Sequence, residues 1–211
     1  MKRPIIIIGA GGHAKVVADA LLAAHEPVEG FTDAESSRRG AMILGIPILG
    51  GDDVVLARGV QSVRLANGIG SVESTARRRE VFMHFRELGF RFVTVVHPRA
   101  TVSPSAVLAE GVQVMAGAVI QAGAVAGENA IVNTSAIVDH DCRIGAHCHL
   151  APGCVLSGGI TIGDGSHIGA GSTVRQGLNL GPNTVVAAGA AVVSDHVGGA
   201  TLAGVPARLL T

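Results

Sequence analysis

A polar segment in the second half of the chain holds the residue types that proton transfer requires. His140 stands between two aspartates in the run Val-Asp-His-Asp-Cys, and Asn133 opens a second polar run seven residues earlier. A neutral imidazole near pH 7 can act as a general base, and a neighbouring carboxylate can fix its tautomer and raise its basicity. We therefore predict a general base at His140, oriented by Asp141. A solvated surface histidine is the alternative.

Other histidines nearby raise the question of a metal site. His147 and His149 lie within ten residues of His140, as zinc ligands often do. The three differ, however, in their place within a six-residue period that runs through this part of the chain. They cannot all face one point on a single chain, so we expect no metal. For His147 and His167 we expect ordinary solvated side chains.

The three cysteines reveal that period. Cys142, Cys148 and Cys154 are six residues apart, and each falls at a position of the period that is usually filled by a small residue. A small buried thiol behaves as a hydrophobic side chain. We therefore expect the cysteines to be structural and reduced, as in a cytoplasmic protein, with no part in catalysis.

The six-residue period organises most of the chain. From Val96 to Val197, 102 residues divide into 17 sixes without an insertion, and the first position is Val, Ile or Leu except at Ala126. A short fixed period is typical of a solenoid, in which the aliphatic residues of successive coils stack into internal ladders. We predict that residues 93–211 form a left-handed parallel β-helix of about five and a half coils, each with three six-residue faces.

A different domain, predicted over residues 1–92, precedes the repeat. The apolar run Ile5–Ile8 leads directly into Gly-Ala-Gly-Gly-His, and an apolar-periodic segment follows through Leu22. Strand, glycine turn and helix in this order are typical of a Rossmann-like phosphate site, because the glycines let the backbone approach a phosphate at the helix N-terminus. A second strand is predicted at Val28–Thr32. It ends in Asp33, where such domains place an acid against a ribose or base.

The rest of this domain is short. A third strand is predicted at Arg64–Ala66, ending at Asn67, and an amphipathic helix at Arg77–Leu88. About three strand–helix units are too few for the two halves of a dinucleotide fold, so a nucleoside diphosphate fits the turn better. The alternative is a glycine turn that only joins a strand to a helix.

Composition excludes several classes of function. The chain has 16 basic and 16 acidic residues, 2% aromatic residues and neither Trp nor Tyr. It therefore offers neither a basic surface nor a stacking platform for nucleic acid. No uncharged apolar stretch reaches the roughly 18 residues that a membrane span needs, and the apolar run near the start is too short for a signal peptide. We expect a cytoplasmic protein.

Taken together, the motifs resemble the sialic-acid O-acetyltransferase-like family of hexapeptide-repeat enzymes. The resemblance rests on the segments GAGGHAKVV, NTS, VDHDC and GVPAR and on the repeat itself, and it covers essentially the whole chain. Within that family the chain is most similar to the N-acetyltransferases of nucleotide-linked 4-amino-4,6-dideoxysugars, as in the bacillosamine and perosamine pathways. This resemblance implies a homotrimer, with acetyl-CoA between neighbouring β-helices and the sugar nucleotide on the N-terminal domain.

The resemblance also implies roles for single residues. His140 would deprotonate the sugar's 4-amino group with Asp141 as its partner, where the bacillosamine enzymes have Glu, and the backbone N–H of Gly158 would stabilise the oxyanion. The candidate substrate-binding residues are Gly11, Gly12, His13, Asp33, Asn67 and Asn133. The candidate acetyl-CoA-binding residues are His149, Ala170, Ala188 and Arg208.

The nucleotide and the acceptor stay open at this point. Bacillosamine-type enzymes carry two acids after the second strand, whereas this chain has Asp33-Ala34, so a GDP-linked sugar such as GDP-perosamine competes equally with a UDP-linked one. The predicted reaction is direct attack of the amine on the thioester. The alternatives are O-acetylation of a sugar such as sialic acid, and a non-catalytic trimeric regulator that binds a sugar nucleotide.

Overall fold

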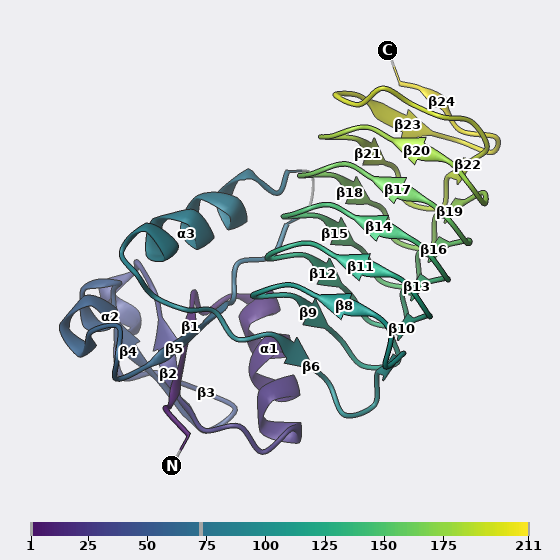
Figure 1. Cartoon of the computed structure of the whole chain (residues 1–211). Helices are drawn as coiled ribbons and strands as arrows, with labels where there is room; N and C mark the ends of the chain where they lie inside the picture. Colours follow the sequence, from purple (N-terminus) through teal and green to yellow (C-terminus); the bar gives the residue numbers. More distant parts are fainter. Residues whose placement is uncertain (1, 72–73, 211) are drawn as a thin grey trace.

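The structure, a computed structural model, describes residues 2–71 and 74–210. Figure 1 shows an α/β domain beside a three-sided β-helix, with the N-terminus in the α/β domain and the C-terminus at the far end of the β-helix. The chain passes from one domain to the other after Phe92, which pairs with Leu65 at the edge of the α/β sheet. The first strand of the β-helix begins at Val95.

The α/β domain is built on a fully enclosed central strand. β1 (Ile5–Ile8) is at most 2% exposed and pairs in parallel with β2 (Val28–Thr32) and β5 (Arg64–Asn67), in a sheet of order β3-β4-β2-β1-β5. Four consecutive isoleucines suit such a strand, because helices cover both faces of a parallel sheet. The other elements are α1 (Gly12–Ala23), the 3-10 helix η1 (Ser36–Arg38), β3 (Met42–Ile43), β4 (Ile46–Gly50), α2 (Asp53–Arg58) and α3 (Ala76–Glu87).

Most of this domain follows the sequence pattern. The strands predicted at Ile5–Ile8 and Val28–Thr32 are confirmed, and the helix predicted at Arg77–Leu88 is α3, displaced by one residue. The sequence does not predict the antiparallel β3–β4 pair. β3 has only two residues, and Pro47 in β4 is a residue type that usually argues against a strand.

The β-helix consists of short strands stacked on three faces, as the six-residue period predicts. The first face contains β6 (Val95–Val96), β9 (Gln113–Val114), β12 (Ile131–Val132), β15 (His149–Leu150), β18 (His167–Ile168), β21 (Val185–Val186), β23 (Thr201–Ala203) and β24 (Arg208–Leu209). The second face contains β7 (Thr101–Val102), β10 (Val119–Ile120), β13 (Ile137–Val138), β16 (Val155–Leu156), β19 (Thr173–Val174) and β22 (Ala191–Val192). The third face contains β8 (Val107–Leu108), β11 (Val125–Ala126), β14 (Arg143–Ile144), β17 (Thr161–Ile162) and β20 (Asn179–Leu180).

The interior of the β-helix contains the aliphatic ladders and the cysteines. Val119 pairs with Ile137 and Ile137 with Val155, so one coil takes 18 residues. The cysteines are free thiols, each 0% exposed, within the same core cluster as the ladders. Burial raises the pKa of Cys148 and Cys154 to about 12. The thiols are therefore protonated at neutral pH, and their expected burial in the core is confirmed.

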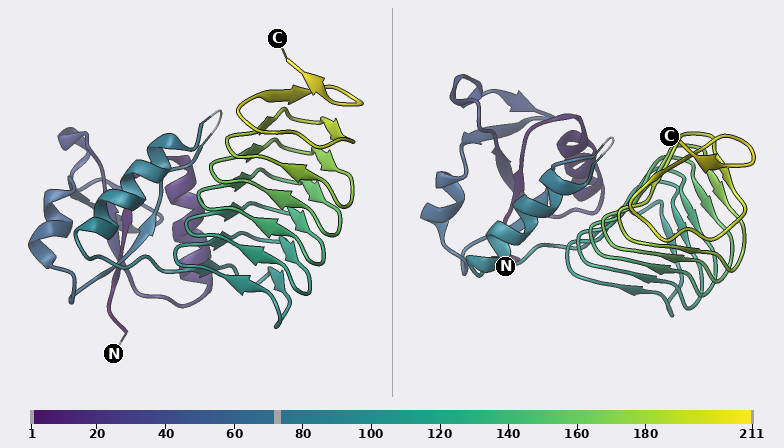
Figure 2. Two further views of the ribbon diagram at one scale, coloured as in Figure 1. Left: turned by 45° about the horizontal axis from the view of Figure 1, so that its top comes forward. Right: turned by 90° about the horizontal axis from the view of Figure 1, so that it is seen from above.

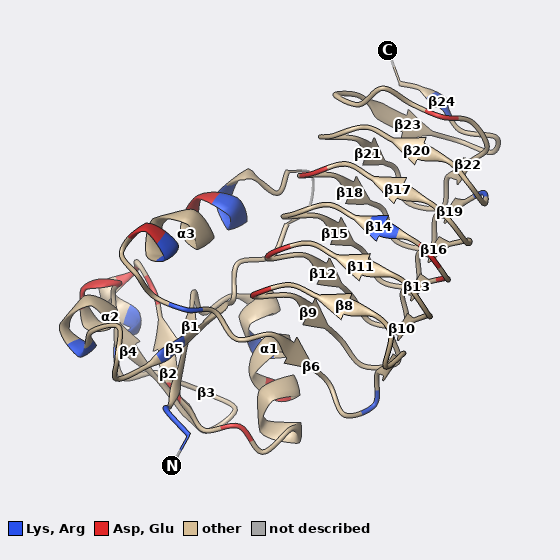
Figure 3. Cartoon of the chain, in the orientation of Figure 1, with Lys and Arg blue, Asp and Glu red and all other residues tan. Residues whose placement is uncertain are grey.

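Helix α3 joins the two domains along one corner of the prism. Figure 3 shows acidic residues at the corner facing α3, between the third and first faces. Arg86 pairs with Glu128 at 3.0 Å and with Glu110 at 3.5 Å. These ion pairs hold the α/β domain against the first face, where Figure 2 also places it. No helix within residues 2–71 and 74–210 is both long and apolar enough to cross a lipid bilayer.

Candidate active site

The predicted base and its partner form a pair at an exposed turn. His140 Nδ1 lies 2.8 Å from Asp141 Oδ2. The two adjacent side chains can meet because Asp141 adopts a left-handed backbone conformation (φ +60°) at the corner between β13 and β14. Its hydrogen bond, and next the charge of Asp139, raise the pKa of His140 above the usual value. A raised pKa makes the imidazole a stronger proton acceptor, as a general base requires.

Two glycines on neighbouring coils leave room for this pair. A Cβ at Gly158 would lie 2.4 Å from His140 Nε2, and a Cβ at Gly123 would lie 2.6 Å from Asp141 Oδ1. The imidazole therefore rests directly against the Gly158 backbone. Among the described residues, no backbone partner takes the Gly158 N–H, whereas its carbonyl accepts from Gly177 N at 2.9 Å. This geometry is compatible with the oxyanion role predicted for Gly158.

The pair lies far from the α/β domain of its own chain. The turn that carries His140 joins the second face to the third, and the α/β domain packs on the first face. In a three-sided prism that corner is opposite the first face, as the view down the β-helix in Figure 2 illustrates. Within a single chain, the predicted base therefore lies apart from the sugar-nucleotide residues predicted in the α/β domain.

The first face presents an outward row of side chains toward the α/β domain. Pairing in register aligns residues of successive coils, so that their side chains share one face. The row is Gln113, Ile131, His149, His167, Val185 and Thr201. The α/β domain covers the beginning of this row. The rest of it borders open cavities.

At the covered end, the glycine turn is tied to the β-helix through His13. Gln113 Nε2 donates to the Asn67 carbonyl at 2.8 Å, so the amide oxygen of Gln113 faces His13 Nε2, also at 2.8 Å. His13 Nε2 must then carry the proton, because a carbonyl oxygen only accepts. Burial, with the Arg78 charge, lowers the pKa of His13 to about 4. The His13 side chain is thus neutral, and the backbone N–H groups at the start of α1 remain as phosphate donors.

Arg78 is a fully buried cation behind this turn that the sequence does not single out among three consecutive arginines. Its guanidinium donates to the carbonyls of Asn67 (2.9 Å), Ile69 (2.8 Å) and Asn129 (3.1 Å). Nη2 has no partner within the described residues. Burial lowers the pKa of Arg78 to about 9, so it is still charged at pH 7 and favours an anionic ligand nearby.

His149 is held by partners on both sides. Asn133 Oδ1 accepts from Thr134 N at 2.8 Å, so Asn133 Nδ2 donates to His149 Nε2 at 3.0 Å. His149 Nδ1 then carries the proton and donates to the Ser71 hydroxyl at 2.6 Å, with the Ser71 carbonyl at 3.1 Å. Burial, with the neighbouring His167, lowers the pKa of His149 to about 3. The ring is neutral, and each of its two nitrogens already has a hydrogen-bond partner.

Two cavities share this histidine. The interdomain cavity, about 690 Å³, is lined by Gly11, Gly12, His13, Gly68, Ser71, Arg77, Asn133, His149 and Pro152, among others. The first-face cavity, about 410 Å³, is lined by Ser71, His149, Ala151, Pro152, His167, Ala170, Val185, Ala188 and Thr201, among others. Four of the six candidate substrate-binding residues thus line the first cavity and three of the four candidate cofactor-binding residues the second, with His149 in the wall that both cavities share.

Three of the predicted binding residues lie outside both cavities. The Asn67 side chain is 1% exposed and bonds to the Arg78 carbonyl and to Asn129, so it belongs to the domain interface and not to the substrate cavity. Asp33 pairs with Arg38, which also donates to the Ala10 carbonyl at 3.2 Å beside the glycine turn. Arg208 is exposed on β24, where its guanidinium bonds to the Ala207 carbonyl.

The expectation of solvated side chains at His147 and His167 is wrong. His147 is 7% exposed, accepts from Asn129 and packs edge-on against Phe82. His167 is 9% exposed and packs edge-on against His149. Phe82 of α3 packs on His147, and His149 packs on His167. The repeat alone cannot show either contact. Across residues 2–71 and 74–210, no three His, Cys, Asp or Glu side chains gather as a metal site.

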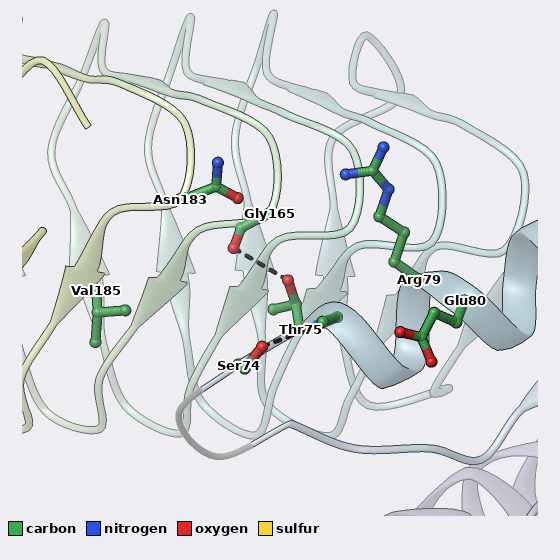
Figure 4. Close-up of a pocket in the computed structure, with 8 residues that line it drawn as sticks. Ser74, Thr75, Arg79, Glu80, Gly165, Asn183 and Val185 are labelled. Atoms are coloured by element: carbon green, nitrogen blue, oxygen red, sulfur yellow. Dashed lines mark hydrogen bonds between the residues drawn. The ribbon is translucent and has the colours of Figure 1, made fainter. Parts of the chain in front are cut away.

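A further cavity of about 430 Å³ opens at the start of α3 (Figure 4). Thr75 Oγ1 donates to the Gly165 carbonyl at 3.0 Å, with Arg79 and Asn183 on either side. It includes none of the predicted site residues. It shares Val185 with the first-face cavity, so the outer surface of the β-helix is hollowed along several coils.

Comparison with known proteins matches both domains. Residues 4–85 match the family model of the PglD N-terminal domain, and residues 135–176 and 159–194 match that of the hexapeptide repeat of succinyl-transferase. The chain is similar to the acetyltransferase domain of PglB from Neisseria gonorrhoeae in complex with acetyl coenzyme A. The two are 39% identical over 100% of both chains, with a TM-score of 0.92. No curated protein matches the chain.

Two further solved structures are similar over nearly the whole chain. A mutant of perosamine N-acetyltransferase from Caulobacter crescentus, in complex with CoA and GDP-perosamine, is 41% identical, with a TM-score of 0.92 over 99% of this chain and 97% of that one. WeeI from Acinetobacter baumannii shares the fold at 23% identity, with a TM-score of 0.88 over 99% of this chain and 100% of that one.

A glycine-turn α/β domain joined to a left-handed hexapeptide-repeat β-helix defines an acyltransferase of the hexapeptide-repeat class. The chain belongs to the sugar N-acetyltransferases of the bacillosamine and perosamine type. It is an acetyl-CoA-dependent sugar N-acetyltransferase, as the family resemblance of the sequence implies.

Proposed function

We propose that the protein transfers the acetyl group of acetyl-CoA to the 4-amino group of a nucleotide-linked 4-amino-4,6-dideoxyhexose, with His140 as general base. The observation that carries the proposal is the His140–Asp141 pair. Nδ1 of the imidazole bonds to the carboxylate, and Nε2, on the other side of the ring, lies against Gly158. A GDP-linked sugar such as GDP-perosamine is the proposed substrate. It is supported by the 41% identical Caulobacter enzyme in complex with GDP-perosamine.

In the proposed reaction, the amine nitrogen attacks the thioester carbonyl carbon and a C–N bond forms. Asp141 accepts a hydrogen bond from His140 Nδ1–H, so the proton stays on Nδ1 and Nε2 is free to take the proton that the amine gives up. Negative charge on the carbonyl oxygen is stabilised by the Gly158 N–H, a rigid donor. The C–S bond then breaks, and the CoA thiolate receives the proton from the imidazolium. No covalent enzyme intermediate is needed.

The proposed active site lies between subunits of a homotrimer. His140 occupies the corner opposite the face on which its own α/β domain packs. A sugar nucleotide in the interdomain cavity would therefore meet the base of a neighbouring subunit. Repeated heterologous contacts that close into a ring give such shared sites in cyclic oligomers.

The first-face cavity is the proposed acetyl-CoA site. Small and apolar residues line much of it, including Ala151, Pro152, Ala170 and Ala188. Short side chains leave room along the coils for an extended, mostly apolar pantetheine arm. The shared wall at His149 would bring the thioester end of the cofactor toward the sugar-nucleotide cavity.

A CoA-release assay across a panel of sugar nucleotides tests this proposal. The panel holds UDP- and GDP-linked 4-amino sugars together with their 4-hydroxy counterparts. We expect turnover with a GDP-linked 4-amino sugar, and a kcat about 10²–10⁴-fold lower for His140→Ala. Turnover of the hydroxy sugars only, or wild-type turnover in the variant, would contradict the proposal.

A further inference from the structure

His167 is a buried histidine without a protein partner, at the border of the first-face cavity. It is 9% exposed, and its Nδ1 is enclosed with no hydrogen-bond partner among residues 2–71 and 74–210. It also lines the cavity. An enclosed N–H left unpaired costs about 1–3 kcal/mol, so the enclosure of Nδ1 bears on which ring nitrogen carries the proton.

The neighbouring His149 has no hydrogen-bonding group free for His167. The rings of His149 and His167 pack edge to face with centroids 4.9 Å apart. His149 accepts from Asn133 on one nitrogen and donates toward Ser71 on the other. A ligand in the first-face cavity can therefore touch the His149 ring but finds no free donor on it.

The position of the His167 proton follows from the enclosure of Nδ1. An orphaned buried N–H is rarer in proteins than an under-satisfied acceptor. The enclosed Nδ1 is thus the bare nitrogen, and the proton lies on Nε2, the ring nitrogen left to face the cavity. Burial also lowers the pKa of His167, so the ring is neutral at pH 7. His167 then presents one N–H donor in a largely apolar cavity.

We propose that His167 binds the pantetheine arm of CoA, with its Nε2–H donating to an amide carbonyl oxygen of that arm. This inference rests on the proposed acetyl-CoA site. The arm carries two amides and one hydroxyl on an otherwise apolar chain, and a single donor among Ala151, Ala170 and Ala188 would fix how far the arm slides along the coils. His167 thereby determines where the thioester lies along the β-helix, whereas His149 contributes only the surface of its ring to the cavity wall.

Calorimetric titration with CoA and with adenosine 3′,5′-bisphosphate, which lacks the arm, tests the proposal. For His167→Leu we expect the Kd of CoA to rise about 5- to 10-fold, the loss of one neutral hydrogen bond, with the Kd of the bisphosphate unchanged. His167→Gln, whose amide N–H reaches the Nε2 position, should bind CoA within about twofold of wild type. In His167→Asn the amide lies nearer the Nδ1 position, so this variant should bind CoA as weakly as His167→Leu.

His147→Leu is the matched control, since His147 is a buried histidine of the same β-helix at the α3 interface, outside the first-face cavity. It should lower thermal stability without changing CoA affinity. Unchanged CoA affinity in both His167→Leu and His167→Asn would overturn the inference. So would equal weakening of CoA and bisphosphate. If the wild-type protein bound no CoA at all, the proposed acetyl-CoA site itself would fall.

Discussion

The imidazole of His140 rests on the backbone of Gly158, one coil further along the β-helix, so closely that a Cβ at 158 would lie 2.4 Å from Nε2. Gly158 has no left-handed φ, so the close approach alone requires glycine here. The same backbone unit therefore positions the proposed base and carries the proposed oxyanion donor. The base and the donor are fixed relative to each other by one contact.

Gly158→Ala is expected to fold and to lose activity. The added methyl group displaces the imidazole, and a displacement of about 1 Å costs roughly 10²-fold in kcat. Steady-state kinetics checks this. Gly171→Ala is the control, because Gly171 lies at another corner with a left-handed φ of +63° and nothing within 4 Å of an added Cβ. It should lose stability only; equal kcat in both variants would contradict the contact.

Asp141→Asn should move the acidic limb of the pH–rate profile. The base is active when deprotonated, so activity rises with pH through the pKa of His140. Asp141 raises that pKa, with Asp139 second. Removing the Asp141 charge therefore moves the limb of kcat/KM to lower pH and lowers kcat by about tenfold or more, since the base becomes weaker. If the acidic limb of kcat/KM stayed at the same pH, a group other than His140 would be responsible for it.

The buried histidines His13 and His149 should make stability fall in acid. Their pKa values drop on folding from 6.5 to about 4 and about 3. Between those values and 6.5 the unfolded chain binds more protons, so unfolding becomes easier as the pH falls through this window. Each histidine accounts for about 1–2 kcal/mol between pH 6.5 and pH 5. Urea denaturation at both pH values measures the loss.

His149→Gln tests that assignment. The variant should be less stable than wild type at pH 7.5, because it breaks the link between Asn133 and Ser71, but its stability should change less between pH 6.5 and pH 5. His84→Gln, on the exposed side of α3, should keep the wild-type dependence. The same acid sensitivity in all three proteins would assign the loss to other groups.

The repeat predicted most of the fold, since a fixed six-residue period permits few arrangements. It also placed His140 outward and the cysteines inward. The burial of His147 and His167 could not be predicted, because both sit at outward positions, where His147 packs against α3 and His167 against His149. Nor could Arg78 be told apart from Arg77 and Arg79, because only the packing of α3 decides which arginine turns inward.

The thiols are expected to take no part in the reaction. A Cys142→Ala, Cys148→Ala double variant should keep its kcat with some loss of stability, because each thiol fills part of the buried core. Comparing CoA release with urea denaturation separates the two effects. Lost turnover in a protein that still unfolds cooperatively would point to a thiol mechanism.

Subunit complementation tests most directly whether the base of one subunit serves the sugar nucleotide of another. His140→Ala removes the base. Gly12→Glu places a negative charge in the interdomain cavity at the start of α1, where an added Cβ meets nothing within 4 Å and helix N-termini favour acids. Each variant alone should be nearly inactive in CoA release. Mixed trimers from co-expression should regain a substantial part of the wild-type rate, because some sites combine an intact base with an intact cavity. Mixed trimers as inactive as either parent would contradict a site shared between subunits.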